Sequence, residues 1–194
     1  MSIEPAIPDQ PGPKEERQPL SPEDRILLET TKVTEEDAAK FPHELVLAVH
    51  KEPTADLRQN FTQWIAKMSI PEKVRLAILG NQEARNLLIH DPNKVIGLAV
   101  LRNPKVTEID IILYSQLRNL PEEVLWEISK HRTWIKNYQV KLALVSNPKT
   151  PLALAIKLLD HLHDRDLQNL SRSKNVSFVL SRSAMRLLFK RRGY

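Results

Sequence analysis

A short apolar phrase that ends in asparagine recurs along this chain, and it constrains the fold more than any other feature. Three copies read Leu-Ala, two apolar residues, one variable residue and Asn, and they close the segments 74–81, 96–103 and 140–147. Their asparagines are 22 and 44 residues apart, which is one step and its double. A degenerate copy lies at 45–52 and a looser relative at 170–175.

This repeated unit is too small to bury its own apolar face, so neighbouring units must bury it jointly, as stacked helical repeats do. The Ala between large apolar residues lets a neighbouring helix approach closely. The Asn ends one helix or caps the next, and the Pro that follows it in two copies prevents the helix from continuing. We therefore predict an all-α chain, a right-handed α-solenoid of short helix pairs, in which Leu76 and Leu142 are buried.

Helix-start signals recur between the repeats. Ser21 is a good N-cap, Pro22 suits the first helical position, and acidic residues follow in the first turn. The same signal is found at 34–37 and, more weakly, at 70–72 and 120–123. Gly80 follows a helical apolar pattern as its C-cap. With no hairpin signal, the sequence predicts about a dozen helices of about 8–14 residues each.

Composition sets the domain boundaries and excludes several classes of protein. Residues 1–20 hold five prolines and predict a disordered tail, and residues 21–192 form the helical repeat domain. The absence of cysteine excludes disulfides, thiolate catalysis and Cys-ligated metals. The longest apolar run, Val95–Leu101, is far below the ~20 residues of a membrane span. No leader peptide is recognised, so we expect a cytoplasmic protein without a membrane segment.

Two phrases carry a resemblance to a known class of proteins. LALVSNPKTP at 142–151 and NLPEEVLWEIS at 119–129 resemble the leucine-rich-repeat-variant and HEAT-like bacterial helical repeats. The resemblance extends over residues 42–190 and implies a helical repeat architecture, with no particular activity. Some variant-repeat proteins carry an iron–sulfur cluster on cysteines, which this chain lacks, so no cluster is expected here.

The sequence offers no convergent set of reactive groups. It has no nucleophile elbow, HExxH, phosphate-binding glycine loop or EF-hand pattern. The acidic and histidine residues of 160–164 are more typical of a solvated helix end than of a metal site, because the two histidines diverge on a helix. We therefore expect no enzyme, no cofactor and no metal.

Tryptophans and asparagines have structural and functional interpretations. Trp126 lies among apolar residues, so we predict that it belongs to the core. Trp134 is flanked by bases, and a surface role and a core position explain it about equally well. Asn81, Asn103 and Asn147 are better explained as caps than as ligands in a groove.

Charge is distributed unevenly. Residues 1–60 carry 7 bases and 13 acids, whereas residues 61–194 carry 22 and 11. No acid follows Asp166, and seven bases do. In the last helix the bases at 182, 186 and 190 share one face, and an apolar side is expected from Phe178, Leu180, Ala184, Leu187 and Leu188. This helix is a solvated cap, an anion-binding edge, or a dock for the acidic N-terminal part.

The leading hypothesis is a non-enzymatic protein–protein interaction or scaffold module with a protein partner. The alternative is a nucleic-acid-binding helical repeat, in which Lys105, Lys149 and Lys174 form one ridge with the C-terminal bases. The candidate partner-binding or anion-binding residues are Lys105, Trp134, Lys149, Arg172, Lys174, Arg182, Arg186, Lys190, Arg191 and Arg192.

Overall fold

The computed structural model describes residues 20–31, 33–47 and 55–193, and within these ranges it contains helices and no strand. The predicted all-α class is therefore confirmed. The predicted tail falls almost entirely on residues 1–19, which lie outside the described residues, as does the end of the repeat copy at 45–52. The elements are α1 (Pro22–Thr30), α2 (Glu35–Ala38), α3 (His43–Val46), α4 (Ala55–Ala66), α5 (Ile70–Leu79), α6 (Gln82–Leu88), α7 (Lys94–Leu101), α8 (Glu108–Gln116), α9 (Glu122–Lys130), the 3₁₀ helix η1 (Trp134–Lys136), α10 (Tyr138–Ser146), α11 (Leu152–Leu159), α12 (Asp164–Arg172) and α13 (Phe178–Arg191).

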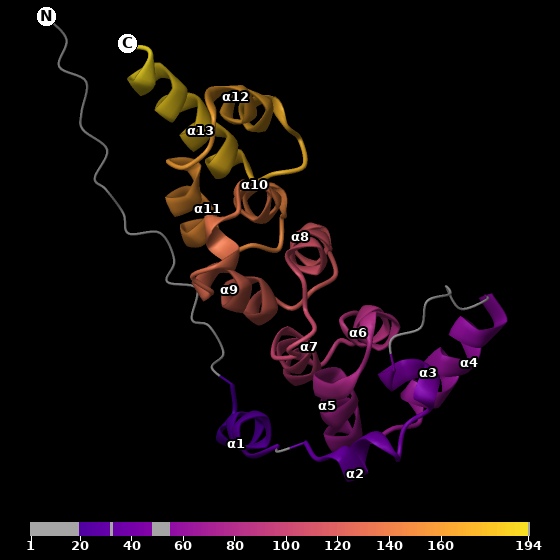
Figure 1. Ribbon diagram of the computed structural model, residues 1–194. Coiled ribbons are helices and arrows are strands. Elements are labelled where there is room, and N and C mark those ends of the chain that lie inside the picture. The colour runs from indigo at the N-terminus through magenta and orange to yellow at the C-terminus, as the bar shows by residue number, and fades with distance from the viewer. Residues whose placement is uncertain (1–19, 32, 48–54, 194) are drawn as a thin grey trace, which may run out of the picture.

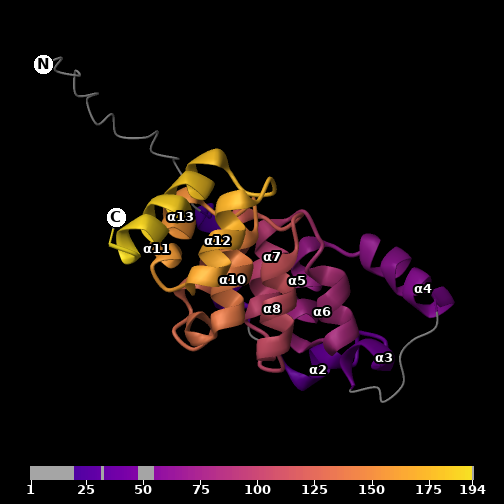
Figure 2. The same ribbon diagram turned by 90° about the horizontal axis from the view of Figure 1, so that it is seen from above.

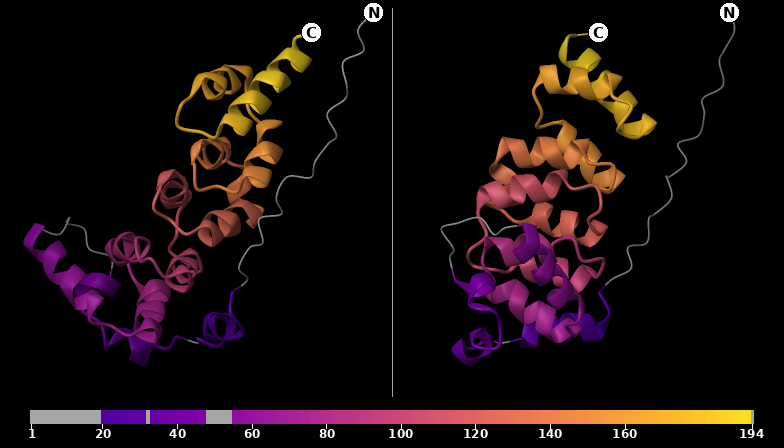
Figure 3. Two further views of the ribbon diagram at one scale, coloured as in Figure 1. Left: turned by 180° about the vertical axis from the view of Figure 1, so that it is seen from behind. Right: turned by 90° about the vertical axis from the view of Figure 1, so that its right-hand side faces the viewer.

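Most of the helices follow one another in two rows (Figure 1). One row holds α6, α8, α10 and α12, and the other holds α5, α7, α9, α11 and α13, an order that the views from behind and from the side also show (Figure 3). Within the rows, α7 packs between α5 and α9, α8 packs on α10, and α11 packs on α13. Helix α1 lies against α7, and α4 extends outward from the two rows (Figure 2), although its Phe61 and Ile65 are buried in the core.

Local sequence determines where the helices begin. The Ser21 hydroxyl accepts a hydrogen bond from the backbone N–H of Asp24 at 3.0 Å, as its predicted N-cap role requires. At the start of α5, Ser69 and Glu72 form a reciprocal capping box, with Pro71 in the first turn. Helices α2 and α3 have four residues each, shorter than predicted, because the chain turns again at Phe41 and Leu47.

Each Ala of the repeated phrase is buried, as close helix packing requires. Ala77, Ala99 and Ala143 all lie in the interior, and Leu76 has no exposed surface. Leu142 differs from the prediction, because it is half-buried and lines a hollow on the surface. Leu142 lies on the side of α10 that faces the space between two neighbouring helices. It is therefore not fully buried, although it holds the same place in the repeat as Leu76.

The two glycines of the helical body allow close approach. A Cβ at Gly97 would lie 2.8 Å from Cγ2 of Val124, where α7 meets α9. Gly80 is the C-cap of α5, as predicted, but its backbone is extended (φ −59°, ψ 156°) and not left-handed. This position requires glycine because there is no space for a side chain: a Cβ there would lie 2.6 Å from the carbonyl oxygen of Leu76.

The repeated asparagines connect each helix end to an earlier one. In each case the side-chain oxygen accepts a backbone N–H just downstream, and the side-chain N–H groups donate to two carbonyls at the end of an earlier helix. We call these contacts the asparagine ties. Asn81 donates to Glu44 and Leu47, Asn103 to Ala77 and Gly80, and Asn147 to Ser115 and Leu117, at 2.6–2.9 Å.

A buried ion pair joins α6 to α8. Nη2 of Arg85 lies 2.8 Å from Oδ2 of Asp110, and both side chains are almost completely buried. The same carboxylate accepts the backbone N–H of Thr107 at the start of α8. Tyr114 is buried beside the pair, and neither its hydroxyl nor Nε of Arg85 has a hydrogen-bond partner among the described residues. Burial, reinforced by the negative charge of Asp110, raises the pKa of Tyr114 to about 12.

Candidate functional site

Seven of the ten candidate residues gather at the C-terminal end of the molecule, and three lie elsewhere. Lys105 follows α7, Trp134 begins η1, and Lys149 follows α10. The other seven belong to one helical hairpin, because α12 and α13 pack against each other. They are Arg172 at the end of α12, Lys174 in the connecting loop, Arg182, Arg186, Lys190 and Arg191 on α13, and Arg192 directly after it.

Lys105 is engaged within the protein. Its Nζ donates to the carbonyl oxygens of Val46 and Leu79 at 3.1 and 3.2 Å, where α3 and α5 end. Lys149 is exposed and lies beside Asn147, which is tied to the end of α8. The structure therefore places the two lysines beside different helices, and Lys105 stabilises two helix C-termini.

Trp134 is half-buried and packs against the core. Its ring is stacked on the ring of His131, with 3.7 Å between the centroids and 22° between the planes. Trp126 is also half-buried, and Nζ of Lys130 lies 5.5 Å from the centre of its ring. Both tryptophans thus combine a core contact with an accessible edge.

Arg191 links α13 to the turn between α11 and α12. Its guanidinium donates to the carbonyl oxygens of Asp160 and Leu162 and to Oδ1 of Asp164, all at 2.7–2.8 Å. The acidic and histidine segment 160–164 is therefore occupied by packing contacts, with His163 stacked on Tyr138. Across the described residues, no three His, Cys, Asp or Glu side chains lie close enough together to hold a metal ion.

Helix α13 is apolar on two sides. Leu180, Ala184 and Leu188 face the protein and are buried. Phe178 was expected on that packed side, and this is wrong: it is 72% exposed. Phe178 is the first residue of the helix, and burial begins two positions later at Leu180. Three more large apolar side chains of α13 are about half exposed, namely Val179, Met185 and Phe189.

The exposed residues form an ordered row. Phe178, Arg182, Met185 and Phe189 are separated by four, three and four positions, so they lie along one side of the helix. We call this row the α13 stripe. The guanidinium carbon of Arg182 lies 5.5 Å from the centre of the Phe178 ring, a cation–π distance that places a charge within the apolar row.

The charges around the α13 stripe are all positive. Arg172, Lys174, Arg186, Lys190 and Arg192 are exposed, and they form no ion pair with the part of the chain that the structure describes. The nearest preceding acid in the sequence, Asp166, accepts a hydrogen bond from the Tyr138 hydroxyl. Helix α13 itself carries no acid, and the two acids of α12 are engaged elsewhere, Asp164 with Arg191 and Asp166 with Tyr138, so positive potential dominates this end.

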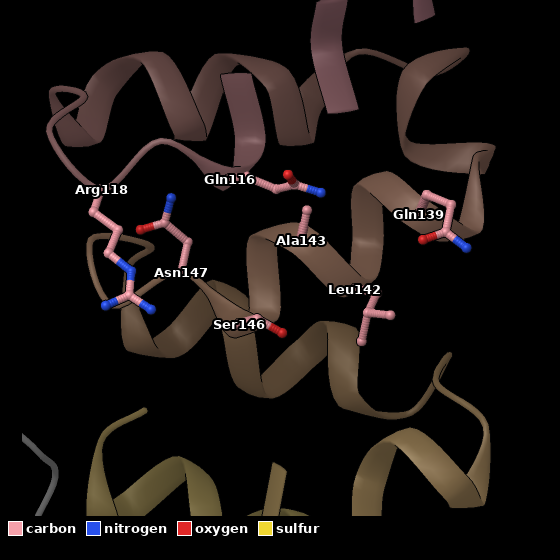
Figure 4. Close-up of a pocket in the computed structure, with 7 residues that line it drawn as sticks. All are labelled: Gln116, Arg118, Gln139, Leu142, Ala143, Ser146 and Asn147. Carbon is pink, nitrogen blue, oxygen red and sulfur yellow. The ribbon is translucent and has the colours of Figure 1, made fainter. Parts of the chain in front are cut away.

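A second surface feature, a groove lined by both polar and apolar side chains, runs along α10 (Figure 4). One hollow of about 250 Å³ lies where α8 and the loop after it face α10. It continues into another of about 350 Å³ toward α12, sharing Arg118, Leu142 and Ser146. Among the described residues, the side chains of Gln116, Arg118 and Gln139 have no hydrogen-bond partner, so they are available to solvent or to a ligand.

Sequence reasoning identified the bases of the hairpin but missed the α13 stripe and the groove. The spacing of the α13 stripe is visible in the sequence, yet Leu180, Ala184 and Leu188 have the same helical spacing, and only packing distinguishes the two faces. The groove residues come from α8, α10 and α12, which are far apart in the sequence, so no local sequence pattern could predict that they lie together.

Comparison with known proteins gives no relative for this chain: no family model, curated protein or solved structure matches it. The helices of residues 20–31, 33–47 and 55–193 include none that is long and apolar enough to cross a membrane.

Proposed function

We propose that this chain is a non-enzymatic protein-interaction module, an α-solenoid of the leucine-rich-repeat-variant or HEAT-like class that binds a protein at its α12–α13 end. The observation that carries the proposal is the α13 stripe, in which Phe178, Met185 and Phe189 face solvent beside exposed cations. The two rows of helices and the repeating asparagine ties support the solenoid architecture.

A helix that only closes a stack of repeats would present a polar outer face, which keeps the protein soluble. The outer face of α13 instead presents three large side chains that are about half exposed or more, grouped on one helix. Exposed apolar groups that cluster and are rimmed by polar residues mark interaction sites. Phe, Met and Arg are also the side chains enriched at the centres of protein interfaces.

A nucleic-acid-binding function is the second candidate, and the seven bases after Asp166 favour it. Phosphate contacts would make binding strongly salt-dependent, with a slope of about −0.9 per phosphate contact for duplex DNA. Single- and double-stranded oligonucleotides titrated into the full chain across a salt series test this candidate. Tight binding with a steep slope would favour it over protein binding.

The direct test of protein binding uses a photo-crosslinking amino acid placed at Met185 in the cells that produce the protein. The control places it at Asn86, an exposed residue of α6. We expect protein adducts from position 185 and none of the same species from position 86. Adducts with nucleic acid alone, or no adduct specific to position 185, would overturn the proposal.

A further inference from the structure

We propose that the α13 stripe docks an amphipathic helix of a partner protein, whose apolar residues are flanked by carboxylates. The inference rests on the proposed protein-binding function and names the partner's chemistry. It is drawn from two independent features of α13: the spacing of its exposed apolar residues and the sign of every charge beside them.

The spacing favours a helix as the partner. Apolar residues that alternate three and four positions apart form the seam along which two helices pair, because this spacing keeps them on one side of both. Phe178, Arg182, Met185 and Phe189 follow this order over nearly the whole length of α13. At 1.5 Å per residue, the 14 residues of α13 extend about 21 Å, which matches a partner helix of about four turns.

The charges favour an acidic partner. Arg186 directly follows Met185 of the α13 stripe, and Lys190 directly follows Phe189, so both cations flank the apolar row. Charges that flank a helix–helix seam determine which partner is accepted. Arg182 lies within the row and would be buried on docking, so the partner needs a carboxylate opposite it to avoid an unpaired buried charge.

The same charges argue against a second copy of this chain as the occupant. Pairing two α13 helices would bring Arg182, Arg186 and Lys190 of one copy against those of the other. No acid is present on either helix to neutralise them. Like charges brought together at an interface cost several kcal/mol, so self-association through this face is disfavoured.

The test measures binding of fluorescent synthetic peptides to the full chain by anisotropy. The first peptide is a helix of about four turns or more, with Leu at three- and four-residue spacing and Glu at the flanking positions. The second replaces Glu by Gln, and the third permutes the first so that the spacing is lost. We expect the Gln peptide to bind at least tenfold more weakly at low salt, and the permuted peptide not to bind.

Substitutions on the protein then locate the site. Phe189→Ser and Met185→Glu are expected to weaken binding of the acidic peptide at least tenfold, since both side chains are already exposed and their replacement leaves the fold intact. Arg182→Glu is expected to weaken binding of the acidic peptide as well, and Arg132→Glu, the same charge change at an exposed position before η1, is its matched control. Circular dichroism and melting temperature confirm that each variant remains folded.

Four results would overturn the inference: equal binding of the permuted peptide, equal binding of the Gln peptide, unchanged binding by Phe189→Ser, and concentration-dependent self-association that Phe189→Ser abolishes. The two proposals can fail separately. If crosslinking at position 185 captures a protein while the acidic helices do not bind, only the partner's chemistry is wrong. If no protein is captured, the proposed protein-binding function is wrong as well.

Discussion

The side-chain amide of Asn103 donates a hydrogen bond to the backbone carbonyl oxygen of Gly80, 2.8 Å away. A second N–H of the same amide reaches the carbonyl of Ala77, and its oxygen accepts the N–H of Lys105. One buried side chain thus satisfies three backbone groups, two of them at the end of another helix. The recurring asparagine of the sequence is therefore a connector between helices as well as a local cap.

Replacing Asn103 by Ala tests the asparagine tie. The change removes three hydrogen bonds and leaves the carbonyls of Ala77 and Gly80 without this donor in a buried place. Unsatisfied buried groups cost about 1–3 kcal/mol each, so we expect the free energy of unfolding to fall by at least about 2 kcal/mol. Urea denaturation measures it. Asn86→Ala, at an exposed position of the adjacent helix, should stay within about 0.5 kcal/mol of the parent chain.

Gly97 reports on the distance between α7 and α9. An added methyl group would lie 2.8 Å from Cγ2 of Val124, which is completely buried, so the two helices or the Val124 side chain would have to shift. We expect Gly97→Ala to lower stability by about 1–3 kcal/mol through overpacking, although Ala favours helix. The double variant Gly97→Ala with Val124→Ala should be more stable than the sum of the single effects predicts. Additive effects in chemical denaturation would show that the two residues are not in contact.

The hydroxyl of Tyr114 is buried and has no hydrogen-bond partner within the part of the chain that the structure describes. Removing it in Tyr114→Phe is expected to leave stability at pH 7 unchanged or raise it by about 1 kcal/mol. The parent chain should lose stability as the pH rises from 10 toward 12, because its pKa of about 12 when folded exceeds the unfolded value of about 10. The variant should lose less over that interval. Urea midpoints at pH 7 and in the alkaline range measure both effects, and parallel alkaline losses would contradict the assignment.

Arg191 and Arg192 are adjacent in sequence but differ in role. Arg191 donates to three oxygen atoms in the turn between α11 and α12 and at the start of α12, whereas the guanidinium of Arg192 forms no such bond among the described residues. We expect Arg191→Ala to lower the melting temperature measurably, because hydrogen bonds from a charged donor contribute about 1–3 kcal/mol to the free energy of unfolding. Arg192→Ala should leave it unchanged. Equal melting temperatures for the two variants would show that the contacts of Arg191 contribute nothing to stability.

Much of the fold follows from local chemistry and is readable in the sequence. Ser21 caps the helix that follows it, and Gly80 ends α5, because these roles depend on a few neighbouring residues. The burial of Leu142 was not readable, because it depends on how far α8 and α12 lie from α10. The second function of Asn103 was equally hidden, since its acceptors are 23 and 26 residues away.

The candidate site divides in the same way. Composition alone located the positive C-terminal hairpin, since seven bases follow the last acid. It could not tell which of them are used internally: Arg191 and Lys105 hold helix ends, while Arg182 and Arg186 remain at the surface. The sequence also could not show that Phe178 is exposed, because the helical spacing alone allows either face of α13 to pack against the rest of the protein.

The asparagine ties also affect the order in which the helices unfold. Each one closes a segment of only 23 to 37 residues, so it depends on two neighbouring helices and on nothing farther along the sequence. Loops this short cost little entropy to close, and contacts this local permit fast folding. Unfolding can then begin at one end and stop at a tie, so amide hydrogen exchange should slow in steps from the ends toward the middle helices.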